Sequence, residues 1–156
     1  MWSSDIELVM RNYEGFLVCF PYDKLPKLKG NNKHWSIIIN TGKSGTAGEH
    51  WVALKRKGDK CFYFDSFGLP IVNKSIVDFV KNSEKVHFSK ICIQDISSFK
   101  CGMFCIVFIK NVNSASSYYE FINSFDFCDV FLNDNIVNNM FNEINIYCLQ
   151  LKSFIS

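Results

Sequence analysis

The sequence predicts an α+β fold in which a small mixed β-sheet is flanked by helices. Short apolar and β-branched runs bounded by turn residues, which are typical of strands, fill its first half. Residues 101–112 and 118–144 instead carry apolar side chains at the three- and four-residue spacing of helices. Because residues 101–112 are the more apolar of the two, we expect that helix to lie buried between the sheet and its other helices.

The N-terminal elements follow from local signals. Ser4 followed by Glu7 forms a capping-box pattern, which predicts a short first helix. Residues 16–20 and 36–40 are strand-like, and the glycine-bearing residues 41–49 between strands predict a loop.

A hairpin is expected next, with residues 48–54 and 61–68 as its arms and residues 56–59 as a four-residue turn. In that register His50 faces Asp65, and directly opposed residues have Cβ atoms about 4.5–5.5 Å apart. A shift of one residue would place them on opposite faces of the sheet.

The remaining elements lead to one cysteine. Residues 73–81 have a helical pattern, residues 86–88 and 91–93 are short strand candidates, and a polar loop then precedes the helix that begins at Cys101.

Cys101 opens the apolar face of its predicted helix. Ser97 or Ser98 can cap that helix, and the free amides of a first helical turn favour a thiolate over a thiol. Gly102 leaves room for a substrate backbone to approach the sulfur. The competing interpretation, that Cys101 is a small buried apolar side chain as free cysteines usually are, would prevail if Cys101 stood alone.

Other polar residues argue for catalysis. Thiol acyl transfer needs a nucleophile, a base and an acid that orients the base, which Cys101, His50 and Asp65 can supply. The side-chain amide of Gln94 and the backbone N–H of Cys101 could then donate hydrogen bonds to the developing oxyanion.

Two other histidines compete with His50 for the role of base. His34 also precedes a tryptophan, but it has no acid across a hairpin and reads as a loop residue beside a strand. His87 lies in a strand pattern without an acid at a suitable spacing. We therefore favour His50.

At these residues the sequence resembles a known family. His50-Trp51, Asp65 within Tyr-Phe-Asp-Ser-Phe-Gly, Gln94 and Cys101-Gly102 follow the order of the adenain-like cysteine proteases. These are maturation proteases of adenoviruses and of related virophage and Maverick/Polinton-type elements, and they share a fold with the ubiquitin-like-protein proteases. The similarity includes residues 20–26 and 38–42 and extends to about Val112.

The resemblance implies a papain-like, adenain-like fold with the nucleophile at the N-terminus of a buried helix. It implies that Trp51 and Gly102 contact substrate, with Trp51 walling a narrow channel beside the nucleophile. It assigns the roles of base, orienting acid, oxyanion donor and nucleophile to His50, Asp65, Gln94 and Cys101.

The function expected from this resemblance is cleavage of capsid or other virion precursor proteins at glycine-containing sites through a thioester. Two alternatives are processing of ubiquitin-like proteins and a non-catalytic scaffold of the same fold. We expect the protein inside infected cells, in cytoplasm or nucleus, and packaged in the virion. The adenovirus enzyme is activated by DNA and by a peptide that forms a disulfide with one of its cysteines. We find no match for that cysteine in this sequence, since Cys92 lies too close to Gln94.

Composition limits the other possibilities. A chain of 156 residues with 48% apolar content suits a single domain, 1–156, which we expect to be monomeric. Its seven cysteines lie mostly in apolar segments, which favours reduced thiols, and no spacing indicates zinc or another cofactor. No apolar run reaches the 18 to 20 residues or so that span a bilayer.

The net charge of +2 hides an uneven distribution, because residues 1–60 hold ten Lys or Arg against six acids. Basic residues within 24–33 and 55–57 could bind nucleic acid weakly, by salt-sensitive phosphate contacts. A solvated basic face is the better interpretation. These residues are Lys24, Lys27, Lys29, Lys33, Lys55, Arg56 and Lys57.

Overall fold

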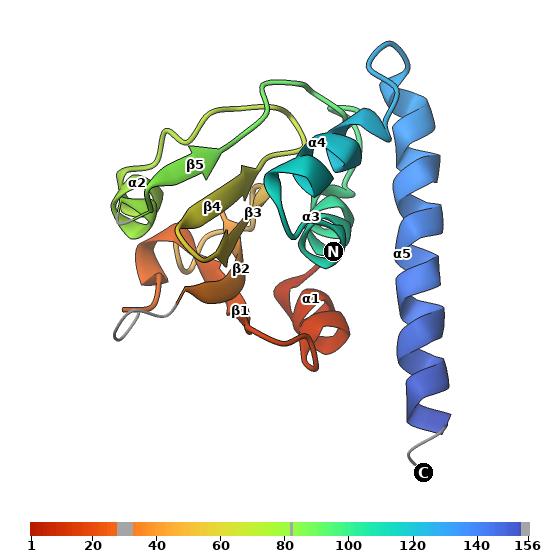
Figure 1. The fold of residues 1–156 in the computed structure, drawn as a ribbon, viewed down its shortest axis with the longest axis horizontal. Coiled ribbons are helices and arrows are strands. Elements are labelled where there is room, and N and C mark those ends of the chain that lie inside the picture. Colours follow the sequence, from red (N-terminus) through yellow and green to blue (C-terminus); the bar gives the residue numbers. More distant parts are fainter. Residues whose placement is uncertain (28–32, 82, 154–156) are drawn as a thin grey trace.

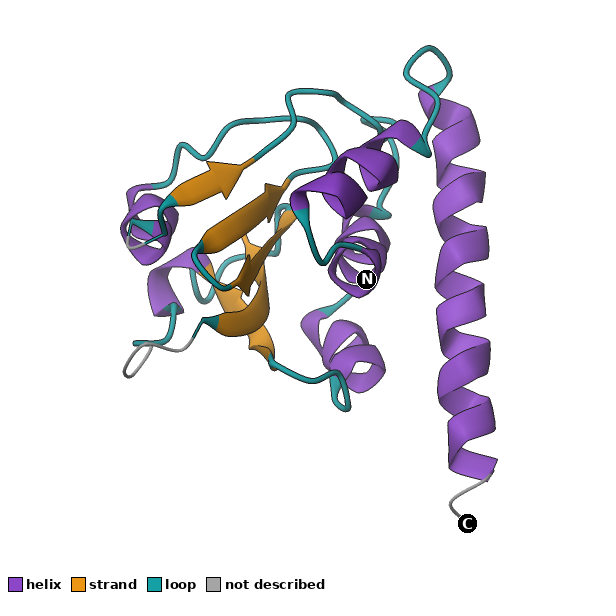
Figure 2. Ribbon diagram, in the orientation of Figure 1, coloured by secondary structure: helices purple, strands orange, loops and turns teal. Residues whose placement is uncertain are grey.

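A five-stranded mixed sheet organises the described part of the molecule (Figures 1 and 2). The structure is a computed structural model that describes residues 1–27, 33–81 and 83–153. The strands follow one another across the sheet in chain order. The outer pairs β1–β2 and β4–β5 are parallel and the inner pairs are antiparallel, which confirms the predicted mixed sheet. The strands are β1 (Phe16–Pro21), β2 (His34–Asn40), β3 (Trp51–Lys57), β4 (Lys60–Phe64) and β5 (Lys85–His87).

Helices cover both faces of this sheet, so the predicted α+β class is confirmed (Figure 1). One face carries α1 (Ser3–Met10), α3 (Cys101–Asn111), α4 (Ala115–Asn123) and α5 (Val130–Ser153). The other carries α2 (Lys74–Val80) and the short 3₁₀ helix η1 (Tyr22–Lys24).

The strands divide their side chains between two apolar layers because successive residues of a strand point to opposite faces. Ile38 and Phe64 pack toward α3, whereas Ile37 and Ile39 pack toward α2. Residues 104–109 of α3 are all buried, as expected for a helix between the sheet and the other helices. The rings of Phe64 and Phe108 stack with centroids 4.8 Å apart, which joins the sheet to α3.

The first helix is present, but its predicted cap is wrong. Helix α1 begins at Ser3, so Ser4 already lies within its first turn. The carboxylate of Asp5 instead accepts a hydrogen bond of 2.8 Å from the backbone N–H of Trp2, the residue before the helix. The helix ends at Met10.

The strand predicted at residues 91–93 is also wrong. The backbone there is irregular, and the N–H groups of Ile93 and Gln94 both donate to the carbonyl of Ser66, at 2.9 and 3.2 Å. Two amides that converge on one oxygen cannot continue a ladder, but they fix this segment beside the end of β4.

The predicted helical tail packs its apolar face on the body, as expected. In α5, Val137 and Phe141 are buried, and the buried Asn133 donates 3.0 Å to the carbonyl of Ile93. Helix α5 runs along the outside of the helical layer (Figure 1). Within the described residues, none of the helices combines the length and the apolar character needed to cross a membrane.

Candidate active site

The hairpin brings His50 and Asp65 together in a register that differs from the prediction. The turn is only residues 58–59, and Lys57 pairs with Lys60. The four-residue turn was therefore wrong, and the register shifts by two residues. Since two residues are one full period of a strand, His50 and Asp65 remain on the same face, and His50 Nε2 lies 3.0 Å from Asp65 Oδ1.

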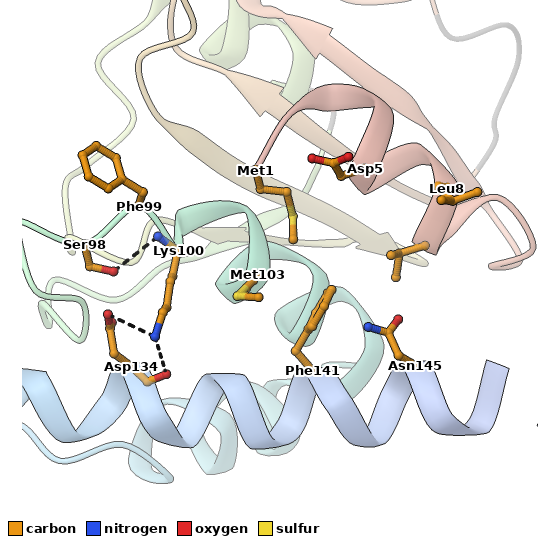
Figure 3. A pocket seen from close by; sticks show the side chains of 11 residues that line it. Met1, Asp5, Leu8, Ser98, Phe99, Lys100, Met103, Asp134, Phe141 and Asn145 are labelled. Atoms are coloured by element: carbon orange, nitrogen blue, oxygen red, sulfur yellow. Dashed lines mark hydrogen bonds and ion pairs between the residues drawn. The ribbon is translucent and has the colours of Figure 1, made fainter. Parts of the chain in front are cut away.

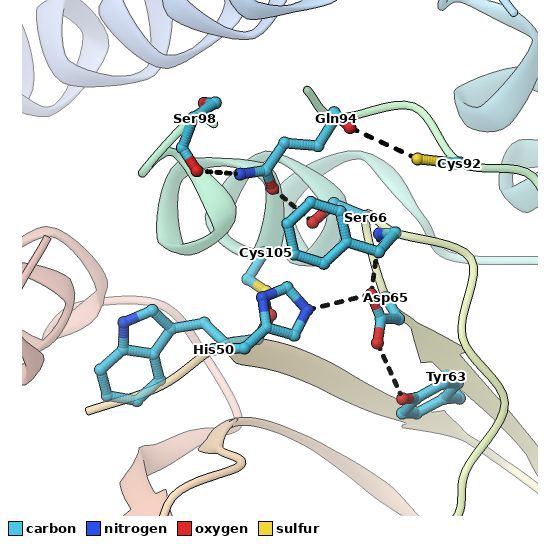
Figure 4. Close-up of polar contacts among 10 residues, drawn as sticks. His50, Tyr63, Asp65, Ser66, Cys92, Gln94, Ser98 and Cys105 are labelled. Carbon is cyan, nitrogen blue, oxygen red and sulfur yellow. Dashed lines mark hydrogen bonds and ion pairs between the residues drawn. The ribbon is translucent and has the colours of Figure 1, made fainter. Parts of the chain in front are cut away.

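The Asp65 carboxylate is buried and held by several donors (Figure 4). Its Oδ1 also accepts a hydrogen bond of 2.8 Å from the backbone N–H of Phe67, and the Tyr63 hydroxyl lies 3.5 Å from its Oδ2. The Phe67 ring stacks on the His50 imidazole with centroids 4.6 Å apart. The imidazole is thus fixed at its edge by a carboxylate and on its face by an aromatic ring.

Cys101 is the first residue of α3, is half-buried, and lines the same hollow as His50. The predicted cap by Ser97 or Ser98 is wrong, because Lys100 is the residue that precedes the helix. The hydroxyl and backbone N–H of Ser97 both donate to the side chain of Asp95, each at 2.6 Å. The first turn of α3 therefore has no side-chain cap, and its amides are free to face the sulfur.

The electrostatics favour a charged pair. Burial raises the pKa of Cys101, but the hydrogen bond to His50 and those from the amides of Trp51 and Gly102 outweigh burial and lower it. Burial likewise lowers the pKa of His50, but its hydrogen bonds and charge interactions with Asp65 and Cys101 raise it to about 9. The geometry therefore favours a thiolate beside an imidazolium, the reactive state of a nucleophilic cysteine.

Gln94 is buried and connects the two halves of the site (Figure 4). Its Oε1 accepts a hydrogen bond of 2.5 Å from the hydroxyl of Ser66, the residue after Asp65. Its Nε2 donates a hydrogen bond of 2.9 Å to the carbonyl of Ser98, in the loop before Cys101. The carboxamide is rigidly held near the start of α3, and its role as an oxyanion donor stays a prediction.

Cys101 opens into a hollow of about 340 Å³. Trp51 lines it, and the Trp51 indole N–H donates 3.2 Å to the carbonyl of Met1. Gly102 is buried instead, and a Cβ there would lie 3.1 Å from the sulfur of Met1 and 3.3 Å from Ile6. The missing side chain at 102 thus lets the N-terminal segment and α1 pack closely on α3, while its part in substrate approach stays a prediction.

A larger, apolar hollow of about 630 Å³ adjoins the first (Figure 3). It lies between α1, the start of α3 and α5, and it shares Met1, Ser98 and Phe99 with the hollow at Cys101. Lys100 Nζ lies 3.5 Å from Asp134 Oδ2 along one wall. The two hollows therefore meet at Met1, Ser98 and Phe99.

The other two histidines take no part in this arrangement. His34 is the first residue of β2, not a loop residue, and it is exposed. His87 is buried against Phe62, with ring centroids 5.1 Å apart. The described residues include no group of three or more His, Cys, Asp or Glu arranged to hold a metal ion.

The proposed basic patch needs a correction at Lys55. This side chain is only 4% exposed, and its Nζ donates to the Ile109 carbonyl, the Tyr13 hydroxyl and the Asn113 side chain at 2.6–2.9 Å. It satisfies the C-terminal end of α3 and cannot reach a phosphate.

The remaining basic side chains give little support to a patch. Lys24, Lys27 and Lys57 are exposed, and Lys33 pairs with Asp59 at 2.5 Å. Lys29 lies outside the described residues. Nucleic-acid contact stays a prediction.

Sequence reasoning missed three residues of this site. Phe67 and Ser66 lie in the arm that supplies Asp65, and Asn40 lines the hollow at Cys101. The Ser-Phe pair directly after Asp65 was the available signal, since a residue next to an orienting acid can reach the same imidazole. Nothing local in the sequence distinguishes Asn40 from other strand-end asparagines.

A thiol paired with an imidazole that a buried carboxylate orients, at the start of a helix packed on a sheet, defines the site of a cysteine peptidase. A family model described as adenovirus endoprotease matches residues 16–144, a span that contains His50, Asp65, Gln94 and Cys101. The chain therefore belongs to the adenovirus endoprotease family of viral cysteine peptidases.

Proposed function

We propose that this protein is the maturation protease of a virus or virus-like mobile element, which cuts capsid or other virion precursors at glycine-containing sites. The observation that carries the proposal is the 3.0 Å contact of His50 with Asp65, made by an imidazole that lines the same hollow as Cys101. Family membership supports a polypeptide as the substrate.

In the proposed mechanism the Cys101 thiolate attacks the scissile carbonyl carbon. The electron pair of the C=O bond moves to oxygen, where the backbone N–H of Cys101 and the amide of Gln94 donate hydrogen bonds. The His50 imidazolium then gives its proton to the leaving amine as the C–N bond breaks, and a thioester remains.

The second half of the cycle releases the acyl group. Neutral His50 removes a proton from water, the hydroxide adds to the thioester carbonyl, and the C–S bond breaks to give a carboxylic acid and the thiolate. Asp65 holds the imidazole in one orientation through both steps and stabilises its charged form.

The walls beside the sulfur support the proposed selectivity for glycine. The rings of Trp51 and Phe67 line the hollow that holds Cys101, so a substrate backbone with small side chains fits between them most easily. The adjoining apolar hollow gives an extended polypeptide further surface beyond the reacting carbonyl, which favours a protein over a small molecule as the substrate.

The biological setting is part of the same proposal. We propose that one catalytic domain, 1–156, works as a monomer inside infected cells and in the packaged virion. DNA or a peptide could modulate the rate, with the exposed lysines at 24, 27 and 57 as the remaining phosphate contacts.

The test is cleavage of candidate capsid precursors and Gly-Gly-containing peptides by the purified protein, with Cys101→Ala as the matched control. We expect cleavage next to glycine by the wild type and none by the variant. Equal, slow cleavage by both proteins would refute the proposal. Cleavage of a ubiquitin-like fusion with all virion precursors left intact would replace the proposed substrate with the alternative one.

A further inference from the structure

The side chain of Asn40 closes the loop that delivers His50. Asn40 is the last residue of β2, and residues 41–49 carry the chain from there to His50. Its Oδ1 accepts hydrogen bonds from the backbone N–H of Gly42, at 2.7 Å, and of Glu49, at 3.3 Å. One carboxamide oxygen therefore ties the first turn of the loop to the residue directly before the imidazole.

The loop is packed closely around this carboxamide. A Cβ at Gly42 would lie 2.9 Å from Asn40 Oδ1, and one at Gly48 would lie 3.0 Å from Asn40 Nδ2. Real side chains are not accommodated at such distances without movement of the neighbour. Asn40 is only 7% exposed, so its side chain acts as the core of the loop.

The same contacts reach the backbone of His50. The Thr41 N–H donates 2.8 Å to the His50 carbonyl, and Asn40 itself pairs with Trp51 across the two strands. The residues on either side of His50 are thus both tied to Asn40, Glu49 by a hydrogen bond and Trp51 by strand pairing. Asn40 also lines the hollow that contains Cys101.

We propose that Asn40 is a positioning residue, whose Oδ1 fixes the end of loop 41–49 so that the His50 ring stays against the Cys101 sulfur. The proposal rests on the proposed function, because it requires that this pair is catalytic. Asn40 acts through His50 and not on the reacting atoms. Its loss displaces the imidazole, and displacements of about 1 Å at an active site cost up to about a hundredfold in rate.

The test compares variants of the full chain by the rate at which iodoacetamide alkylates Cys101 at different pH. Modified peptides are quantified by mass spectrometry, with the exposed Cys92 and Cys128 as references within each sample. Asn40→Ala removes both hydrogen bonds, and Asn40→Asp keeps an acceptor oxygen in place. Asn73→Ala is the matched control. Asn73 Oδ1 also accepts a hydrogen bond from the backbone N–H two residues ahead, that of Ser75, at 2.9 Å. This bond lies at the start of α2, on the face of the sheet away from Cys101.

We expect Asn40→Ala to slow alkylation of Cys101 at about pH 6 by about tenfold and to move the profile to higher pH. Asn40→Asp restores most of the rate, and Asn73→Ala keeps the wild-type profile. Should Asn40→Ala fail to fold, Gly48→Ala takes its place, since the added methyl group displaces the same carboxamide, and we expect the same direction of change.

Two unfavourable results have different meanings. A wild-type profile in Asn40→Ala or Gly48→Ala, with fast alkylation of Cys101 in each, would overturn the role of Asn40 and leave the protease intact. Alkylation of wild-type Cys101 no faster than that of the exposed thiols would instead refute the catalytic pair itself.

Discussion

The ionisation states of Cys101 and His50 set the pH range of the proposed activity. The pKa of the thiol is lowered and that of the imidazole is raised to about 9, and both shifts favour a thiolate–imidazolium pair. Above the pKa of His50 the imidazole loses the proton that the leaving amine needs. The proposed mechanism therefore has an alkaline limit to kcat/KM.

The first prediction concerns that limit. The wild type should lose kcat/KM as the pH rises through about 9. Asp65→Ala removes a hydrogen bond and a charge that raise the pKa of His50, so the limit should move to lower pH. The measurement is the pH profile of peptide cleavage, with Tyr63→Phe as the control, because its hydroxyl touches the carboxylate only at 3.5 Å. An unchanged alkaline limit in Asp65→Ala would contradict the role of the carboxylate.

The residues proposed to carry the chemistry could be picked out from the sequence more easily than the residues that hold them. Cys101, His50 and Asp65 stand out because ionisable side chains bordering apolar elements need a reason to be there. Phe67 and Asn40 do not stand out, because a ring that stacks on an imidazole or a carboxamide that closes a loop depends on distances between separate segments.

The loop after β4 is the element that joins the acid to the segment carrying Gln94. Gly68 has a φ of +69°, and a Cβ there would lie 2.7 Å from backbone atoms of Lys90 and Ile91. Two backbones thus approach each other directly at a residue that also adopts a left-handed conformation.

The second prediction separates these two effects. Gly58 also has a positive φ, of +62°, but a Cβ there would meet nothing within 4 Å. Gly58→Ala should therefore lower the free energy of unfolding by about 1–2 kcal/mol, the cost of the conformation alone. Gly68→Ala should lose a further 1–3 kcal/mol or so through overpacking. Urea denaturation measures both, and equal losses would show that the backbone contact at Gly68 is unimportant.

The hairpin shows why element type was predictable and register was not. The alternation of apolar and polar residues fixes which face each side chain occupies, and it correctly put His50 and Asp65 on one face. It says nothing about a shift by a whole period, which depends on whether the chain turns in two or four residues. Gly58 allows the tighter turn because it adopts the positive φ that two-residue turns require.

For Lys55, sequence reasoning failed for a physical reason. A lysine beside Arg56 and Lys57 reads as part of a charged surface, yet strand alternation turns it inward toward the end of α3. The third prediction follows, since Lys55→Met leaves the Ile109 carbonyl and the Asn113 oxygen without the ammonium group that donates to them. We expect a loss of about 1–3 kcal/mol in the free energy of unfolding, measured in urea. Lys57→Met, at an exposed position of the same strand, should change it by less than about 0.5 kcal/mol.

For the molecule as a whole, the layers of the fold were predictable, but the backbone of the segments that connect them was not. Apolar spacing identified α3 as the buried helix and the tail as an amphipathic helix that packs on the body. The reason is that apolar residues recur at helical spacing along a buried helix face. The irregular segment 91–93 resembled a strand because it is apolar, but its amides are used by the Ser66 carbonyl instead of a neighbouring strand.

The stability of the whole molecule should respond to His87. This histidine is 7% exposed, its Nε2 has no partner among the described residues, and burial with the nearby charges of Lys85 and Lys60 lowers its pKa. The unfolded chain, with a histidine pKa of about 6.5, then binds more protons than the folded one. The contribution of His87 to the free energy of unfolding is therefore complete above about pH 6.5 and declines as the pH falls below that value.

The fourth prediction is a fall in the free energy of unfolding between about pH 6.5 and pH 5 that His87→Phe reduces. Phenylalanine keeps the stack on Phe62 and cannot take up a proton. Urea denaturation at the two pH values measures the difference. An equal fall in the wild type and in the variant would assign the acid sensitivity to other groups.

The most direct test of the central claim is the ultraviolet absorbance of the thiolate at about pH 7. We expect a thiolate signal in the wild type that Cys101→Ala abolishes and that His50→Ala strongly reduces, because the neighbouring imidazolium stabilises the charge. If the wild type and Cys101→Ala have the same thiolate absorbance at that pH, Cys101 is an ordinary thiol and the proposed catalytic pair is wrong.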